Sequence, residues 1–258
     1  MRIAPEDLEE LRTAKGILEN PGITAKLTNL VGRPLEKGLR LLPGDWQEKV
    51  GAATQDALMA ALKGALLTMG PGTSEANPRW HKFAAAMSGG IGGAFGLPAL
   101  IVELPVSTTI MLRSIADIGR SHGEVLSTPQ AQVACLEVFA LGGPGGGDDS
   151  SESGYFAVRG AMARAVTEAS RYLAEKTAVE EGAPALVRLI AVIAARFQVQ
   201  VSEKAAAMAV PLIGAIGGGG INLLFIDHFQ GMSRGHFAVR RLERRYGQEL
   251  VRDMYERL

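Results

Sequence analysis

The sequence predicts an all-α protein, a single multi-helix bundle with two central apolar segments rich in glycine and alanine. Three observations support this fold class. Apolar side chains recur at helical spacing along most of the 258 residues. Proline and N-capping residues stand at the starts of these patterns. No segment has the run of alternating β-branched residues between turns that predicts a strand.

The first part of the chain is expected to form helices separated by turns. Pro5 and the acidic residues after it predict a helix start, because proline fits the first turn and acids favour the positive end of the helix dipole. A second helical pattern covers residues 23–41 and contains Pro34, which we expect to kink or divide it. Asp45 is the predicted N-cap of the next helix. Residues 70–78 are a predicted loop.

Two long uncharged segments follow, one from Phe83 to Val102 and one from Ala205 to Ile226. Each has about the ~20 residues that a membrane-spanning helix needs. Both contain glycines at spacings that let helices approach closely. These glycines form the candidate surface for helix packing or lipid binding: Gly89, Gly92, Gly93, Gly96, Gly214, Gly217 and Gly218.

The sequence leaves three interpretations of these segments. They could span a bilayer, although alanine, glycine, serine and proline contribute little transfer free energy. They could be the buried central helices of a soluble bundle, which the sequence favours because a helix that is apolar all round is a central one. They could also form a hairpin against a membrane. Both begin with Ala-Ala-Ala-Met, which indicates either a weak internal repeat or a coincidence of composition.

The remaining segments are also predicted to be helical. A helix from Pro129 to Leu141 is expected to start at Ser127 or Thr128, and residues 142–154 read as a flexible loop. Further helices are expected over residues 155–176 and 184–203. We expect one domain over residues 1–258, with N-terminal helices at 1–78, the first apolar segment at 79–141, the loop at 142–154, and the second apolar segment and C-terminal helix at 155–258.

Charged residues near the apolar segments supply two candidate features. Glu103 lies in an apolar context with Arg113 ten residues later, so we predict a structural ion pair inside the bundle rather than an acid–base pair. Near the C-terminus, an amphipathic helix carries four arginines, Arg240, Arg241, Arg244 and Arg245. Such a helix can lie on an anionic membrane surface, although nearby acidic residues favour a solvated outer helix.

The composition excludes several classes of protein. Lys and Arg number 27, and Asp and Glu also number 27, so there is no basic excess for a nucleic-acid partner. Glycine and proline together are about 17 % of the chain, below the ~25–30 % of low-complexity sequences. A single cysteine, Cys135, cannot form an intramolecular disulfide or a cysteine-based zinc cluster.

No catalytic or metal-binding pattern has the context that it requires. Residues 231–235 match the nucleophile elbow of serine hydrolases, with Ser233 as the nucleophile and His236 three residues later. The elbow needs a preceding strand, and the preceding segment is predicted to be helical. The histidines lack a metal-ligand set, and the glycine clusters lack phosphate-binding motifs. We therefore expect no cofactor and no metal, and we keep a serine hydrolase or peptidase using Ser233 as an alternative.

Several segments resemble the EcsC family. The most telling is Leu104–Gly123, where a proline–threonine–threonine element leads into an arginine-containing helix that ends before glycine. Similar elements of the family are found at Leu30–Glu36, at Leu42, Pro43 and Trp46, at Leu136–Phe139, at Val210–Asn222 and at Phe237–Arg241. Ser107 and His122 depart from the family pattern, and the loop at 142–154 looks inserted.

The resemblance covers residues 20–247 and implies a helical accessory protein rather than a defined reaction. The family takes its name from a gene beside an ABC-transporter operon linked to protein secretion, and it supplies no catalytic residues to carry over. We therefore expect a non-enzymatic, membrane-associated protein that binds lipid, acyl chains, or a transporter or secretion component. A soluble homo-oligomeric scaffold is a further alternative. The charged first fifteen residues show no cleavable signal peptide, so we expect a cytoplasmic location, at the inner face of the membrane.

Overall fold

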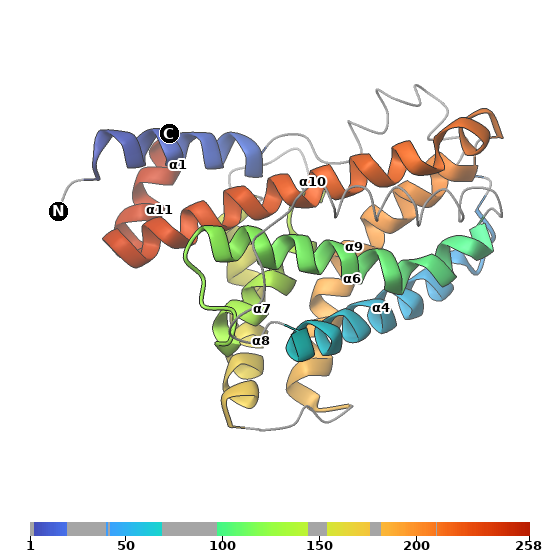
Figure 1. Cartoon of the computed structure of the whole chain (residues 1–258), viewed down its shortest axis with the longest axis horizontal. Helices are drawn as coiled ribbons and strands as arrows, with labels where there is room; N and C mark the ends of the chain where they lie inside the picture. The colour runs from blue at the N-terminus through green and yellow to red at the C-terminus, as the bar shows by residue number, and fades with distance from the viewer. Residues whose placement is uncertain are drawn as a thin grey trace.

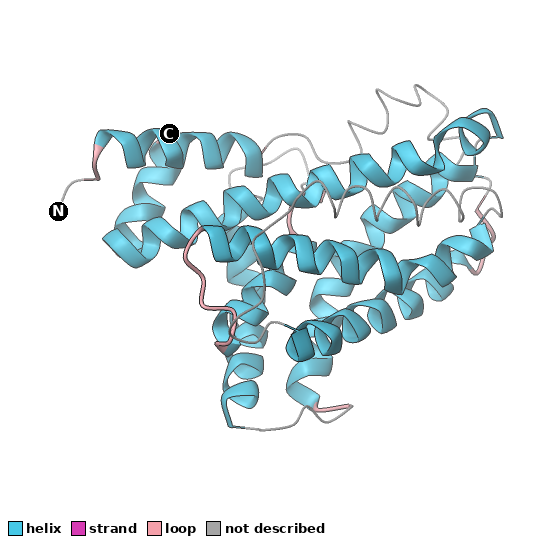
Figure 2. Ribbon diagram, viewed as in Figure 1, coloured by secondary structure: helices cyan, strands magenta, loops and turns pink. Residues whose placement is uncertain are grey.

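The computed structural model describes residues 3–19, 40, 42–68, 97–143, 154–175, 182–209 and 211–258. These residues form helices and contain no strand, so the predicted all-α class is confirmed (Figures 1 and 2). The elements in chain order are α1 (Pro5–Leu18), α4 (Trp46–Thr68), α6 (Leu97–Ser121), α7 (Pro129–Glu137), the short 3-10 helix η1 (Val138–Ala140), α8 (Tyr155–Glu175), α9 (Pro184–Ala209), α10 (Pro211–Tyr246) and α11 (Gln248–Arg257).

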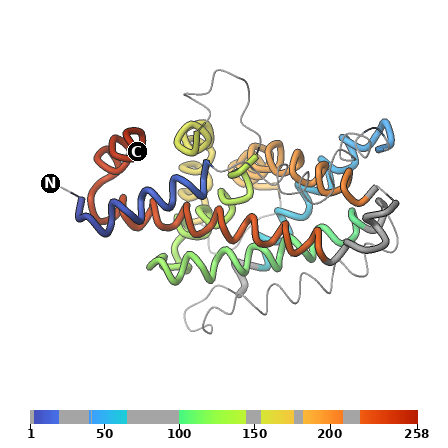
Figure 3. Tube along the Cα trace, turned by 90° about the horizontal axis from the view of Figure 1, so that it is seen from above, coloured from blue at the N-terminus to red at the C-terminus, as the bar shows by residue number. Residues whose placement is uncertain are grey.

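Helix α10 runs along the middle of the molecule, with α1 and α6 beside it (Figures 1 and 3). Helix α6 runs in the same direction as α10, and α1 runs in the opposite direction. Two glycines permit these close contacts. A Cβ on Gly119 would lie 3.0 Å from Cζ of Phe237, and a Cβ on Gly235 would lie 2.7 Å from Cγ of Leu18. Larger side chains at either glycine would push the helices apart.

The largest buried side chains gather where η1, α9 and α10 meet. Ring centroids are 4.9 Å apart for Phe139 and Phe197, and 5.3 Å apart for Phe225 and Phe229. The rings are tilted or edge-on, which is the favourable geometry for aromatic pairs. Helix α4 packs against both α6 and α9, and α8 packs against α9. The buried apolar side chains of these helices form one continuous hydrophobic core.

The structure confirms several helix starts that were predicted from proline and N-capping residues. Helix α1 begins at Pro5, and Thr128 caps α7 by accepting a hydrogen bond from the backbone N–H of Ala131 at 3.3 Å. Helix α6 continues across Pro105, although proline has no N–H to donate to the preceding turn. Just after this proline, the hydroxyl of Thr109 donates to the carbonyl oxygen of Pro105 at 2.8 Å.

The second uncharged segment is divided between two helices. Helix α9 ends at Ala209 and α10 begins at Pro211, because proline fits the first turn of a helix and cannot continue the preceding one. In the described part of the chain, one helix is long and apolar enough to cross a membrane, Pro184–Met208, with a mean hydropathy of 1.5. Only the last residues of this helix, from Ala205 on, belong to the second uncharged segment. The first segment lies outside the described residues up to position 96.

Candidate functional site

Among the described residues, charged side chains enter the helical interior at several places, and two of these places join three helices each. Glu103, Lys204 and Asn222 form the first, which we name the Glu103 cluster and which joins α6, α9 and α10. The second, named the His236 cluster, joins α7, α8 and α10 and contains Glu137, Tyr155, Arg159, His236 and Glu243. Burying charges is costly unless they are paired, so both places are candidates for function.

The Glu103 cluster is a buried ion pair with one amide partner. Oε1 of Glu103 accepts a hydrogen bond from Nδ2 of Asn222 at 2.7 Å and lies 3.5 Å from Nζ of Lys204. The side chains of Glu103 and Lys204 are 7 % and 2 % exposed. Nζ of Lys204 also lies 5.4 Å from the centre of the Phe225 ring. Burial lowers the pKa of Lys204, and the charge of Glu103 partly offsets this.

The pairing of Glu103 differs from the sequence prediction. Arg113 is exposed, and it lies ten residues, or about 15 Å, further along the same helix. The predicted Glu103–Arg113 ion pair is therefore wrong. Glu103 directly follows the first uncharged segment and Lys204 directly precedes the second. This bracketing was visible in the sequence and could have suggested the pair that forms.

One oxygen of the Glu103 cluster is left without a partner. Among the described residues, Oε2 of Glu103 makes no hydrogen bond although it is buried. An unsatisfied buried polar atom costs about 1–3 kcal/mol, and more when it carries charge. The cluster therefore has a spare acceptor in an apolar part of the bundle.

Two exposed valines stand beside Glu103 on α6. Val102 is 78 % exposed and Val106 is 54 % exposed. They lie one turn apart on the same side of the helix, away from the buried Leu100 and Leu104. We name them the α6 aliphatic face. Val125, just beyond the other end of α6, is similarly exposed at 62 %.

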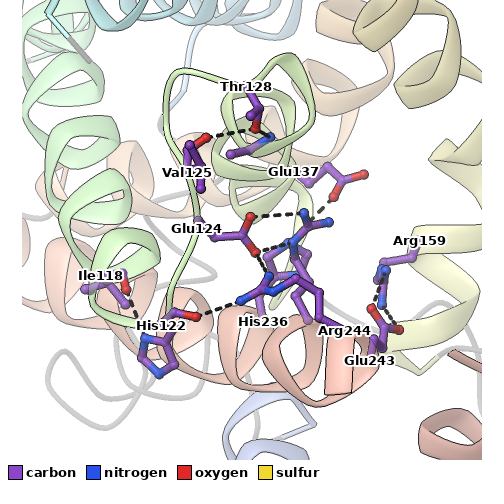
Figure 4. A network of polar contacts seen from close by, with 12 residues as sticks. Ile118, His122, Glu124, Val125, Thr128, Glu137, Arg159, His236, Glu243 and Arg244 are labelled. Carbon is purple, nitrogen blue, oxygen red and sulfur yellow. Dashed lines mark hydrogen bonds and ion pairs between the residues drawn. The ribbon is translucent and has the colours of Figure 1, made fainter. Parts of the chain in front are cut away.

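The His236 cluster is held by hydrogen bonds and ion pairs, of which Figure 4 shows the pair between Arg159 and Glu243. Arg159 binds both carboxylate oxygens of Glu243, at 2.7 and 3.1 Å, and also donates to the Tyr155 hydroxyl oxygen at 3.3 Å. The Tyr155 hydroxyl is then free to donate to Nδ1 of His236 at 2.9 Å. In this arrangement Nε2 of His236 carries the ring proton and faces Oε2 of Glu137 at 3.6 Å, beyond hydrogen-bond distance.

Burial sets the protonation states in the His236 cluster. It lowers the pKa of His236 well below its usual value, and Arg159 and Arg240 lower it further. Burial also raises the pKa of Glu137, against the opposing charges of Arg159 and Arg240. The imidazole is therefore neutral near pH 7, and Glu137 keeps its proton to higher pH than an exposed carboxyl group.

The replacement Glu137→Gln tests this assignment through the pH dependence of stability. A raised pKa means that the wild-type protein loses stability as pH rises from the ordinary carboxyl value through the raised one. The variant has no such proton to lose. Urea unfolding should show the variant gaining stability relative to wild type as pH rises above about 4, the ordinary carboxyl value.

Glu124→Gln is the control, because the pKa of Glu124 is shifted in the opposite direction from that of Glu137. Burial opposes ionisation of Glu124, but hydrogen bonds and charges from Arg240 and Arg244 hold its pKa below the usual value. That stability is present above the ordinary carboxyl pKa and is lost on acidification. The control variant should therefore be less stable than wild type near neutral pH, with the difference shrinking in acid. A pH-independent effect of Glu137→Gln would contradict the assignment.

Two of the four C-terminal arginines bind the connection between α6 and α7 (Figure 4). Nε of Arg240 donates to Oε1 of Glu124 at 2.9 Å. Arg244 binds the same carboxylate and donates to the carbonyl oxygen of His122 at 2.7 Å. Glu124 is nearly buried, so these pairs fix α10 against the end of α6.

The other two arginines bind the first helix. Arg241 contacts Asp7 at 3.1 Å and also Glu10, and Arg245 contacts Asp7 at 2.8 Å. The Tyr246 hydroxyl donates to Asp7 at 2.7 Å, and this bond and the two arginines hold the pKa of Asp7 below its usual value. All four arginines of the candidate membrane surface are thus engaged in ion pairs within the chain.

The other sequence candidates are placed as follows. Ser233 is buried in the middle of α10, and its hydroxyl donates to the carbonyl oxygen of Ile115 at 3.4 Å rather than to His236. Helix, not strand, precedes it, so the nucleophile elbow does not form. Among the described residues, no group of three His, Cys, Asp or Glu side chains could hold a metal ion.

The candidate glycine surface is only partly described. Gly89, Gly92, Gly93 and Gly96 lie outside the described residues, and Gly214, Gly217 and Gly218 lie in the helical backbone at the start of α10. The closest contacts between helices that the structure describes at a glycine are at Gly119 and Gly235. Sequence reasoning did not identify either as a packing position, because the contacted helices are distant in the chain.

Comparison with known proteins gives one result. No curated protein and no solved structure matches the chain. The model of the EcsC protein family matches residues 6–242 of the 258, which includes α1 and most of α10. The chain therefore belongs to the EcsC protein family.

Proposed function

We propose that this protein is a non-enzymatic accessory protein that associates peripherally with a lipid surface through the α6 aliphatic face. The observation that carries the proposal is the pair of exposed valines, Val102 and Val106, one turn apart. Val102 is the last residue of the first uncharged segment, and Val106 lies just beyond Glu103. We propose the cytoplasmic side of a membrane as the location, with lipid rather than a transporter or secretion component as the primary partner.

The size of the aliphatic face favours reversible association. Full burial of one aliphatic side chain contributes about 1.5–3 kcal/mol. Partial transfer of two valines into the interfacial region therefore gives on the order of 2–4 kcal/mol. This is enough for peripheral binding when many lipid molecules are present, and far less than the insertion of a spanning helix provides.

The four arginines of the candidate membrane surface contribute little to this proposal. Arg241 and Arg245 are held by Asp7, and Arg240 and Arg244 by Glu124. A guanidinium that is already paired gains little from an anionic headgroup, because the intramolecular pair must first be broken or shared. We therefore expect only a weak dependence of binding on anionic lipid and on salt.

Flotation with vesicles tests the proposal. The double variant Val102→Asp with Val106→Asp should reduce the vesicle-bound fraction at least tenfold, because an ionised carboxylate does not enter the apolar region of a bilayer. Val125→Asp is the matched control, since it changes an equally exposed valine beyond the other end of α6. Both proteins should keep the melting temperature of wild type.

Three results would overturn the proposal. One is a wild-type protein that does not float with vesicles of mixed phosphatidylcholine and phosphatidylglycerol. Another is an equal loss of binding for Val125→Asp. A third is a dimer that the double variant dissociates, which would assign the valines to a second copy. Labelling of wild type, but not Ser233→Ala, by an activity-based serine probe would instead support the hydrolase alternative.

A further inference from the structure

The Glu103 cluster has hydrogen-bonding capacity that the chain does not use. Oε2 of Glu103 is buried and makes no hydrogen bond among the described residues. Nζ of Lys204 carries three N–H groups, and in the same part of the chain it makes one hydrogen bond, at 3.5 Å, to Oε1 of Glu103. A spare acceptor and spare donors therefore lie side by side in an apolar environment.

The chemistry of these two groups selects a ligand class. A ligand group that uses both must accept a hydrogen bond from the ammonium of Lys204 and donate one to the carboxylate of Glu103. The hydroxyl of an alcohol or of a carboxylic acid does both, whereas an ester only accepts. A phosphate adds negative charge that, together with Glu103, exceeds the single positive charge of Lys204. The cluster therefore fits a neutral head group that carries a hydroxyl.

The position of the cluster suggests what the head group is attached to. Glu103 follows Val102 directly and lies about 60° around the helix from Val106. An apolar chain in contact with the α6 aliphatic face would thus carry its head beside Glu103. We infer that the Glu103 cluster binds the hydroxyl-bearing head of a single-chain lipid, a fatty alcohol or a fatty acid in its protonated form. This inference rests on the proposed function and names its ligand class.

Titration calorimetry without vesicles tests the inference. The full chain is titrated at one pH, about 5, where part of decanoic acid is protonated, with decanoic acid, decanol and methyl decanoate, each below its micellar or solubility limit. Decanoic acid and decanol should bind with similar dissociation constants. Methyl decanoate should bind at least tenfold more weakly, because it has no proton for Oε2 of Glu103.

Two variants test whether the Glu103 cluster causes the tighter binding of decanoic acid and decanol over methyl decanoate. The double variant Glu103→Leu with Lys204→Met replaces the pair by apolar groups of similar size, and it should bind all three compounds alike. Glu103→Gln should also bring the dissociation constant of the ester closer to those of the acid and the alcohol. The amide oxygen of the glutamine can still accept the hydrogen bond from Asn222, and its NH₂ group can donate to the ester. Arg159→Met with Glu243→Leu removes the ion pair of the His236 cluster and should keep the tenfold preference.

The outcomes separate this inference from the membrane proposal. Equal binding of the acid and the ester to wild type, no binding of any compound, or a preference that survives in the Glu103→Leu and Lys204→Met double variant would each overturn the inference. If the protein floats with vesicles but binds the acid, the alcohol and the ester alike, the membrane proposal holds and the head-group inference is wrong. If the protein binds the acid and the alcohol tenfold more tightly than the ester but does not float with vesicles, the head-group site holds and the membrane proposal is wrong.

Discussion

Glu103→Leu is expected to lower the free energy of unfolding by about 3 kcal/mol, because it leaves the buried ammonium of Lys204 without its charged partner. The variant also removes the acceptor of the 2.7 Å hydrogen bond from Asn222. Part of the cost can be relieved by loss of the Lys204 proton, so the deficit should shrink as pH rises. Urea unfolding at pH 7 and pH 9.5 measures both effects.

The double variant Glu103→Leu with Lys204→Met is the control for this prediction. Replacing a buried ion pair with apolar side chains of similar volume is often neutral or stabilising. We expect it to recover most of the loss and to fall within about 1 kcal/mol of wild type. A double variant as unstable as Glu103→Leu alone would show that the loss comes from packing and not from an unpaired charge.

Gly142→Ala is expected to lower the free energy of unfolding by about 3 kcal/mol, from two separate causes. The backbone of Gly142 has φ +69°, which strains any residue with a Cβ. In addition, the new Cβ would lie 2.5 Å from Cε1 of His228 and 2.8 Å from Sδ of Met232. Both side chains are buried on α10 and cannot move aside freely.

Gly182→Ala separates the two causes. Gly182 has a similar φ of +83°, but nothing lies within 4 Å of the position of its Cβ. This variant should show the backbone cost alone, about 1 kcal/mol. Thermal or urea unfolding of the two variants side by side gives the difference. Equal losses would contradict a steric conflict between residue 142 and His228.

Helix starts could be predicted from the sequence because their signals are local. Pro5, Thr128 and Pro184 each act within one helical turn, and α1, α7 and α9 begin beside them. One helix end is also a local signal. Gly247, with φ +90°, separates α10 from α11, although the apolar pattern continues from one helix into the next.

The candidate site was less predictable because its contacts join residues far apart in the chain. Lys204 pairs with Glu103 across 101 positions, and no local pattern encodes this distance. The wrong partner, Arg113, could have been rejected, since ion pairs along one helix need a spacing of three or four residues.

The arginines of α10 illustrate the same limit. Their spacing indicates a basic face, but the acidic partners of Arg241 and Arg245 on α1 are more than 230 positions away. The partner of Arg240 and Arg244, Glu124, is 116 and 120 positions away.

The central claim is that the α6 aliphatic face contacts lipid, and a fluorescent label tests it most directly. Cys135 is buried and burial raises the pKa of its thiol, so a label attached through cysteine should react only at an introduced site. An environment-sensitive label on Val106→Cys should shift to shorter wavelength and brighten when vesicles are added. The same label on Val125→Cys should not change. Equal shifts at both positions, or none at Val106→Cys, would contradict the claim.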